Sequence, residues 1–74
     1  MRLVLVTRRG CHLCDEALKL LREMGVEPDL ADVDADAGHF SLYDWRVPVL
    51  LRDGEVVAEG RISVDQLRKA LNRS

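Results

Sequence analysis

A short, unbroken run of apolar residues lies near the start of the chain. The run from Leu3 to Val6 contains no polar position, and such a run is typical of a strand that is buried on both faces of a sheet. Thr7 and Gly10 end the run. We therefore expect a central β-strand at residues 3–6.

The next segment has the periodicity of a helix that begins near His12. Its apolar residues recur at helical spacing, and they are Leu13, Ala17, Leu20, Leu21 and Met24. They form one stripe of a 3.6-residue period. Gly25 follows, and glycine is the residue type that most often ends a helix. The pattern therefore predicts an amphipathic helix with a glycine stop.

Residues 26–33 predict a weaker strand. Pro28 cannot donate a hydrogen bond to a neighbouring strand, and acidic residues interrupt the apolar pattern, so we expect this strand at an edge of the sheet. A strand, a helix and a second strand form a βαβ unit, in which the two strands are parallel. The crossover of such a unit is right-handed in nearly all known proteins.

Residues 36–44 predict a short helix of at most two turns. The apolar pairs in this segment are brief, and Gly38 weakens the helical pattern. We assign Phe40, Tyr43 and Trp45 to a small satellite core rather than to a platform for a substrate.

The segment from residue 47 to residue 58 has the pattern of a β-hairpin. Residues 47–51 are apolar, and a second strand at residues 55–58 follows the dipeptide Asp53-Gly54. This dipeptide favours a type I′ turn between two strands. The two strands are therefore expected to be antiparallel.

The last helix has the clearest local signature. Ser63 and Gln66 have the spacing of a capping box, and Ile62 and Leu67 stand at the positions of a hydrophobic staple. The expected core-facing stripe comprises Val64, Leu67, Ala70 and Leu71. The predicted order is β-α-β-(short α)-β-β-α, an α/β arrangement in a single domain over residues 1–74.

Composition supports a small packed domain and argues against two classes of partner. Of 74 residues, 47% are hydrophobic, which suits one domain with a buried core. A total of 11 Lys and Arg against 13 Asp and Glu leaves a net charge of -2, so neither nucleic acid nor a membrane surface is an expected partner. The apolar run after Arg2 is too short for a secretory signal, and no run reaches the length of a membrane span. We therefore expect a cytoplasmic protein.

Both cysteines of the chain fall in one C-x-x-C motif, Cys11 and Cys14. In a reducing compartment such a pair is more often catalytic, redox-active or metal-binding than a structural disulfide. The motif lies at the start of the first predicted helix, where unpaired N–H groups and the helix dipole favour a thiolate. We expect Cys11, on the loop side, to be the nucleophile. Cys14, beside the buried stripe, would then resolve the mixed disulfide.

Charged neighbours of opposite sign have opposite effects on the stability of the Cys11 thiolate. Arg8, Arg9 and protonated His12 favour it, whereas Asp15 and Glu16 oppose it if they come close. We expect a net stabilisation of the thiolate, because the basic residues lie on the Cys11 side of the motif. These three residues also have a simpler interpretation. Arg8 and Arg9 can belong to a solvated loop, and His12 can be an exposed residue in the first turn of the helix.

With these motifs in this order, the chain resembles the thioredoxin-like superfamily, and within it the small glutaredoxin-like proteins. The shared features are a strand, C-x-x-C at a helix start, a second strand, a short middle helix, a Val47-Pro48 step, a hairpin and a final helix. The resemblance covers nearly the whole chain. It implies a three-layer fold, in which a four-stranded mixed sheet carries the first and last helices on one face and the middle helix on the other.

The same resemblance implies where a substrate binds. Pro48 should follow a cis peptide bond beside the cysteine pair, leaving the backbone of Val47 free to pair with an extended substrate. Glutaredoxins commonly have a Thr-Val-Pro step and, before the last helix, a Gly-Gly turn. In these two regions this chain has Arg46-Val47-Pro48 and Glu59-Gly60-Arg61, with one glycine. Arg46 can pair with a glutathione carboxylate, while the loss of one glycine can block close approach. Glutathione is therefore a candidate co-substrate, and we expect no tightly bound cofactor.

Three functions remain open at this point. The leading hypothesis is a monomeric thiol–disulfide oxidoreductase that reduces protein or glutathione mixed disulfides and is regenerated by glutathione or a thioredoxin-type reductase. A second is metal binding by Cys11 and Cys14 with His12 or His39, or an iron–sulfur cluster shared between two chains. A third is a binding or adaptor domain that keeps the fold and the cysteines with little turnover.

Overall fold

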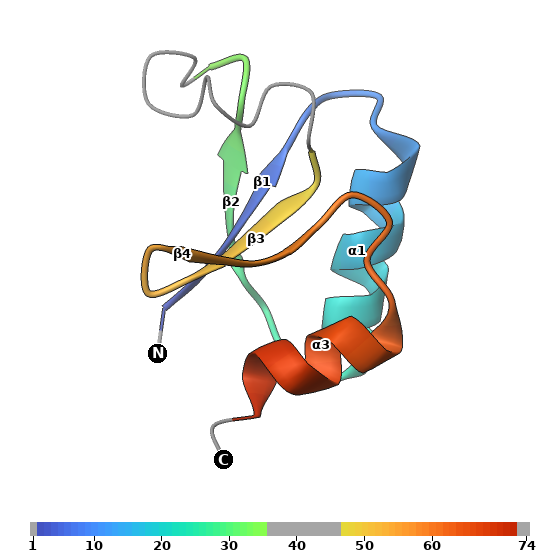
Figure 1. Cartoon of the computed structure of the whole chain (residues 1–74). Helices are drawn as coiled ribbons and strands as arrows, with labels where there is room; N and C mark the ends of the chain where they lie inside the picture. Colours follow the sequence, from blue (N-terminus) through green and yellow to red (C-terminus); the bar gives the residue numbers. More distant parts are fainter. Residues whose placement is uncertain (1, 36–46, 73–74) are drawn as a thin grey trace.

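The computed structural model describes residues 2–35 and 47–72. The elements are β1 (Leu3–Thr7), α1 (His12–Glu23), β2 (Asp29–Asp32), β3 (Val49–Arg52), β4 (Glu55–Glu59) and α3 (Val64–Leu71) (Figure 1). Their predicted order is confirmed. The helical turns predicted for residues 36–44 lie outside the described residues, as do Phe40, Tyr43 and Trp45.

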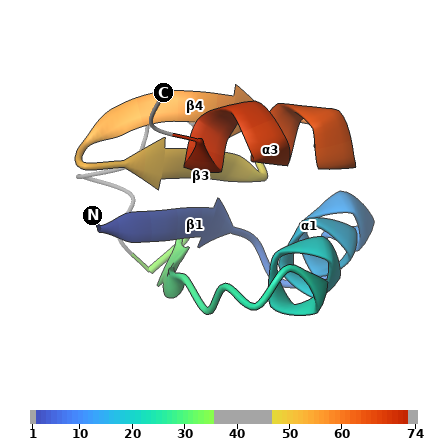
Figure 2. The same cartoon turned by 90° about the horizontal axis from the view of Figure 1, so that it is seen from below.

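The four strands form one mixed sheet in the order β2-β1-β3-β4, and Figure 2 shows β4, β3 and β1 side by side. Strand β1 pairs parallel with β2, with Thr7 opposite Asp32. It pairs antiparallel with β3, with Val6 opposite Val49, and β4 is antiparallel to β3. The apolar run is therefore the central strand, and the weaker strand after Pro28 is at an edge, as predicted.

The hairpin between β3 and β4 turns at Asp53-Gly54, where φ is 52° and 88°. Positive φ at both central residues is the requirement of a type I′ turn, so the predicted turn is confirmed. The turn is also attached to the start of the chain. The Asp53 N–H donates to the Arg2 carbonyl, and the Arg2 N–H donates to Asp53 Oδ1, both at 2.8 Å.

Helices α1 and α3 lie on the same face of the sheet (Figures 1 and 2). A buried cluster joins both helices to the strands, and its members are Leu3, Leu5, Ala17, Leu21, Leu50, Ala58, Ile62, Leu67 and Ala70. A second cluster comprises Val6, Val33, Val49 and Leu51. Successive residues of a strand point to opposite faces, and Leu5 and Val6 are both 0% exposed. The central strand is therefore buried on both faces.

Two expected core positions are wrong. Met24 is the C-cap residue of α1 and is 36% exposed, and Val64 is the first residue of α3 and is 37% exposed. Both stand at a helix end, where the periodic stripe continues in the sequence but the contact with the core does not. The buried residues of α1 are Ala17 and Leu21, which belong to the predicted stripe, and Cys14, which the prediction placed beside it.

The helix ends signalled in the sequence are confirmed. After α1, Gly25 has a φ of 80° and the Val26 N–H donates to the Leu21 carbonyl at 2.9 Å, which is the long hydrogen bond of a Schellman motif. Before α3, Ser63 Oγ accepts from the Gln66 N–H and Gln66 Oε1 accepts from the Ser63 N–H, a complete capping box. In the described part of the chain, neither helix is long and apolar enough to cross a bilayer.

Candidate active site

Pro48, Gly60 and the loop that leads to Cys11 lie at one end of the sheet. Val6 lies opposite Val49, and Val49 lies opposite Glu59. The end of β1, the start of β3 and the end of β4 therefore meet at the same end of the sheet, where Pro48 and Gly60 also lie. The loop that connects β1 to the start of α1 leaves from this end (Figure 1).

Cys11 and Cys14 are paired at disulfide-bonding distance, with their Cα atoms 5.2 Å apart. Cys11 is the N-cap residue of α1, with an extended backbone at φ -82° and ψ 110°. Its Sγ accepts a hydrogen bond from the backbone N–H of Cys14 at 3.1 Å. The sulfur thus takes the place of the side-chain oxygen in an ordinary N-cap, at the positive end of the helix dipole.

The two cysteines differ in their access to solvent. Cys14 is 2% exposed and belongs to the buried side of α1, whereas Cys11 is half-buried. A bulky reagent can therefore reach Cys11 more easily than Cys14. This difference matches the positions that the helical stripe predicts for the two residues.

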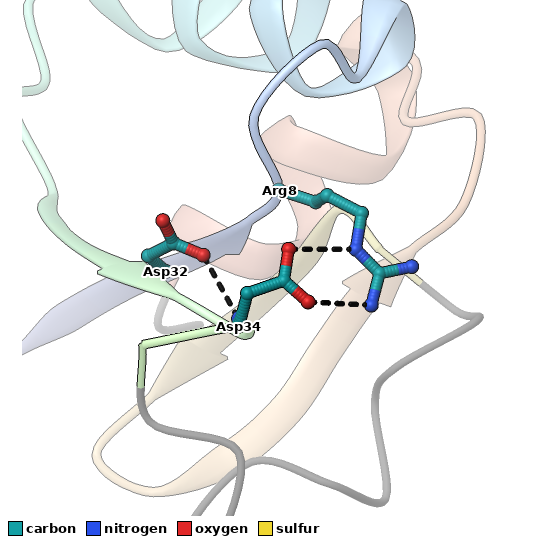
Figure 3. Close-up of polar contacts among 3 residues, drawn as sticks. All are labelled: Arg8, Asp32 and Asp34. Atoms are coloured by element: carbon teal, nitrogen blue, oxygen red, sulfur yellow. Dashed lines mark hydrogen bonds and ion pairs between the residues drawn. The ribbon is translucent and has the colours of Figure 1, made fainter.

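The loop before Cys11 is tied to the end of β2. The Cys11 N–H donates to the Arg8 carbonyl at 3.1 Å. The Arg8 guanidinium donates from Nε to Asp34 Oδ2 at 3.1 Å and from Nη2 to Asp34 Oδ1 at 2.9 Å (Figure 3). The Asp34 N–H in turn donates to Asp32 Oδ1 at 2.8 Å. Arg8 therefore contacts the cysteine motif through its main chain and Asp34 through its side chain.

Arg9 and His12 are both exposed near the motif. Arg9 lies in the loop before Cys11, and His12 is the first residue of α1. These positions agree with an exposed loop residue and an exposed first-turn residue. A role of Arg8, Arg9 and His12 in favouring the thiolate stays a prediction.

The Val47-Pro48 peptide bond is cis, as the resemblance implies. Pro48 is buried and Val47 is half-buried. The Pro48 carbonyl accepts a hydrogen bond from the Gly60 N–H at 2.9 Å, which joins the start of β3 to the end of β4. Arg46 lies outside the described residues. The binding of a substrate by Arg46, Val47, Pro48 and Gly60 stays a prediction.

Gly60 is required by its backbone rather than by crowding. Its φ is 68°, a conformation that residues with a Cβ adopt at a cost. A Cβ placed there would meet no heavy atom within 4 Å. Gly60, the one glycine in the region where glutaredoxins commonly have two, therefore allows a backbone conformation after β4 that other residues adopt only at a cost.

A shallow hollow of about 360 Å³ adjoins the buried cysteine. It is lined by residues of the β1–α1 loop, α1 and β2, among them Arg8, Cys14, Leu30 and Asp32. Among the described residues, no three or more His, Cys, Asp and Glu side chains come together as a group able to hold a metal ion. The metal-binding hypothesis thus keeps only the two cysteines as ligands in this part of the chain.

Asp32 and Asp34 were not among the residues predicted for the site. The signal that could have found them is their position at the end of the second strand of the βαβ unit, where Asp32 is the last strand residue and Asp34 lies two residues beyond it, while Arg8 directly follows the first strand. Because parallel strands end at the same edge of a sheet, residues that follow them lie near one another.

Comparisons with known proteins agree with this geometry. The model of the family described as "Glutaredoxin-like domain (DUF836)" matches residues 2–72. No curated protein matches the chain. The match to the family model and the four-stranded mixed sheet both support membership of the thioredoxin-like superfamily.

Several solved structures are similar to this one over nearly their whole length. The structural genomics target protein XcR50 from X. campestris is 34% identical with a TM-score of 0.77, covering 93% of each chain. Protein Ne2328 from Nitrosomonas europaea is 28% identical with a TM-score of 0.78, covering 96% of this chain and 91% of that one. The thioredoxin-like protein BC3987 is 29% identical with a TM-score of 0.76, covering 95% of this chain and 100% of that one. The expected thioredoxin-like α/β fold is thereby confirmed.

Proposed function

The chain belongs to the glutaredoxin-like domain family, and from this membership we propose that it is a thiol–disulfide oxidoreductase that uses Cys11 and Cys14. The observation that carries the proposal is the position of Cys11 Sγ, which caps α1 and accepts the Cys14 N–H at 3.1 Å. A sulfur in this position is stabilised as a thiolate by the N–H group and the helix dipole. The thiolate is the form that attacks a disulfide.

In the first step, the Cys11 thiolate attacks one sulfur of a client disulfide. A bond forms between Cys11 Sγ and that sulfur, the S–S bond of the client breaks, and the other client sulfur leaves as a thiolate that takes a proton from solvent. Because Cys14 is 2% exposed, a client reaches Cys11 first. The product of this step is a mixed disulfide between Cys11 and the client.

In the second step, Cys14 loses its proton to solvent and its thiolate attacks Cys11 Sγ. The Cys11–Cys14 bond forms, the mixed disulfide breaks, and the second client sulfur leaves as a thiolate and is protonated. The client has then gained a pair of electrons, and the cysteine pair has lost it. The pairing of both sulfurs at disulfide-bonding distance, with Cα atoms 5.2 Å apart, supports this step without a large movement of α1.

The oxidised pair needs a thiol reductant to complete the cycle. We propose glutathione or the dithiol of a thioredoxin-type reductase as this electron donor, and protein disulfides or glutathione mixed disulfides as clients. The client chain would pair with the Val47 backbone beside the cis Pro48, with Gly60 at the same end of the sheet, and Arg46 would bind a carboxylate of glutathione. We place the protein in the reducing cytoplasm as a monomer.

The test compares two substitutions of the same size. Cys11→Ser should abolish reduction of a small disulfide, because it removes the attacking sulfur. Cys14→Ser should keep the first step and accumulate a mixed disulfide with a client protein, which non-reducing electrophoresis detects. Turnover by Cys11→Ser at the rate of the wild type would refute the proposal. Reduction of the oxidised protein by glutathione, compared with a thioredoxin-type reductase, then identifies the electron donor.

A further inference from the structure

Leu30 is an apolar residue that the fold leaves uncovered. It lies on the edge strand β2 and is 54% exposed, more than any other large hydrophobic residue in the described part of the chain. Leu30 stands opposite Leu5 in the parallel pairing of β1 and β2, so the two side chains point to the same face of the sheet. Leu5 belongs to the buried cluster that includes Ala17 and Leu21 of α1. Leu30 therefore continues the helix-covered face out to the edge of the sheet, where the helix no longer covers it.

The Leu30 side chain lines the hollow of about 360 Å³ beside the cysteine pair. Leu18 lines the same hollow from α1 and packs against the buried cluster. Gly10 and Cys14 line it as well. Gly10 is joined to Cys11 by a peptide bond, and Cys14 is paired with Cys11 at disulfide-bonding distance. The hollow therefore adjoins the residue that would carry the sulfur of a client.

The charges in the lining of the hollow balance. Its basic residues are Arg8 and Arg9, and its acidic residues are Asp15 and Asp32. Two positive and two negative side chains leave the lining without a net charge, so long-range attraction favours neither an acidic nor a basic partner. Selection of a partner by this hollow then depends on its apolar residues.

The hollow lies on a different side of β1 from the cis peptide bond. Pro48 directly precedes β3, whereas Leu30 belongs to β2, and β1 lies between these two strands. Successive residues of an extended chain are about 3.3 Å apart, so a client side chain that enters the hollow belongs to a residue close to the client cysteine. Sites for drug-sized ligands begin at about 300 Å³, so one large side chain fits the volume of the hollow.

We propose that this hollow is a binding subsite for client polypeptides, which takes an apolar side chain directly beside the client cysteine and packs it against Leu30 and Leu18. The contact removes apolar surface of both partners from water. Leu30 is then a residue that determines which client is preferred, without a part in the sulfur chemistry. The proposal rests on the thiol–disulfide exchange at Cys11 proposed above.

The experiment measures which of two peptides occupies Cys11 when both compete for it. Cys14→Ser prevents the second step and keeps the size of this lining residue, and Cys11 is first loaded as a mixed disulfide with glutathione. Equal amounts of two peptide thiols are then added, which differ only by Leu or Ala directly before or directly after the cysteine. The peptide sulfur forms a bond with Cys11 Sγ, and glutathione leaves as a thiol. Mass spectrometry gives the ratio of the two mixed disulfides at equilibrium.

With Leu30 present, the Leu peptide should be favoured about fivefold in at least one of the two positions, as expected for the partial burial of its three additional carbon atoms. Leu30→Ala should reduce this ratio to about twofold or less. Leu30→Thr should do the same, and it keeps a residue type that favours strands, which separates the lost contact from a disturbed β2. Equal amounts of both peptides in both positions, or a preference that both Leu30 variants retain, would overturn the proposal.

A matched control lies on the opposite edge strand. Val56 of β4 is 40% exposed, and Val56→Ala should keep the fivefold preference. The same competition in urea, where the covalent chain is intact but the hollow is absent, should give equal amounts of the two peptides. A loss in Val56→Ala as large as that in Leu30→Ala, or a preference that persists in urea, would refute a role of the hollow.

Two further peptides test whether charge decides the preference instead. They carry Asp or Lys in the place of Leu, and the Leu peptide should outcompete both of them. A stronger mixed disulfide with either charged peptide would show that the charged lining selects the client, and it would also overturn the proposal. The competition needs a single exchange at Cys11 and no turnover. A wild type that reduces no client disulfide would thus refute the proposed function, while the role of Leu30 is decided separately.

Discussion

The position of Cys11 at the N-cap of α1 predicts that folding itself ionises this thiol. The perturbation is to unfold the reduced Cys14→Ala protein in urea at pH 7, which removes the helix but leaves the covalent structure unchanged. Alanine retains the backbone N–H that donates to Cys11 Sγ at 3.1 Å and adds no hydroxyl group. The prediction is that Cys11 is largely a thiol in urea and is substantially ionised in the folded protein.

The magnitude follows from two contacts of the sulfur. The helix dipole contributes about 0.5 kcal/mol, and a hydrogen bond to a charged acceptor contributes about 1.5 kcal/mol at the low end of its range. Together, about 2 kcal/mol multiplies the ratio of thiolate to thiol by about 30-fold. Since a free cysteine is roughly a few per cent ionised at pH 7, the folded protein should be about half ionised there.

The assay is the ultraviolet absorbance of the thiolate, read in the folded and the unfolded protein at the same pH. Alkylation is a weaker second measurement, because a stabilised thiolate is also a poorer nucleophile, with a Brønsted coefficient of about 0.4–0.5. The folded protein should therefore react only about three- to fourfold faster than the unfolded one. Equal ionised fractions in the two states would refute the reasoning from the N-cap.

Three further predictions concern stability. Ser63→Ala removes half of the α3 capping box and should lower the free energy of unfolding by about 1 kcal/mol, which calorimetry would record as a fall in Tm of about 4–8 °C. An unchanged Tm would contradict the role of the cap. Gly25→Ala places a side chain at a φ of 80° and should cost about 1–2 kcal/mol, measured by urea denaturation, and a cost near zero would show that the helix end had rearranged. The hydrogen bond from Arg22 holds the pKa of Glu27 below its ordinary value. The stability that Glu27 contributes is therefore present above the pKa of the unfolded state and lost as the pH falls through the pKa of the folded state. Urea denaturation curves of the wild type and Glu27→Gln should converge in acid, and a difference that persists there would contradict this sign.

Much of the fold could be predicted because its signals are local. The capping box of Ser63 and Gln66, the glycine stop at Gly25 and the Asp53-Gly54 turn each depend on a few adjacent residues. Backbone geometry over such a short segment is determined mainly by those residues themselves. These elements accordingly appear where the pattern places them.

Burial at the ends of the elements could not be predicted in the same way. Met24 and Val64 continue the apolar stripes of their helices, yet both are exposed. Whether an apolar residue is covered depends on which other element lies opposite it, and periodicity does not contain that information. The cis bond before Pro48 could not be predicted from the residues either, since only about one X–Pro bond in twenty is cis in folded proteins. That prediction came from the resemblance to a family.

The sequence by itself determined that two thiols lie one turn apart at the start of a helix, with Cys11 outermost, because spacing and capping act within a few residues. Only the tertiary structure decided that Arg8 meets Asp34, a residue 26 positions away. That contact depends on the parallel register of β1 and β2, which brings the ends of both strands together. Register is set by pairing between distant segments, so the ends of the two strands indicate the region in which the partner of Arg8 lies, but the local pattern does not identify Asp34 as that partner.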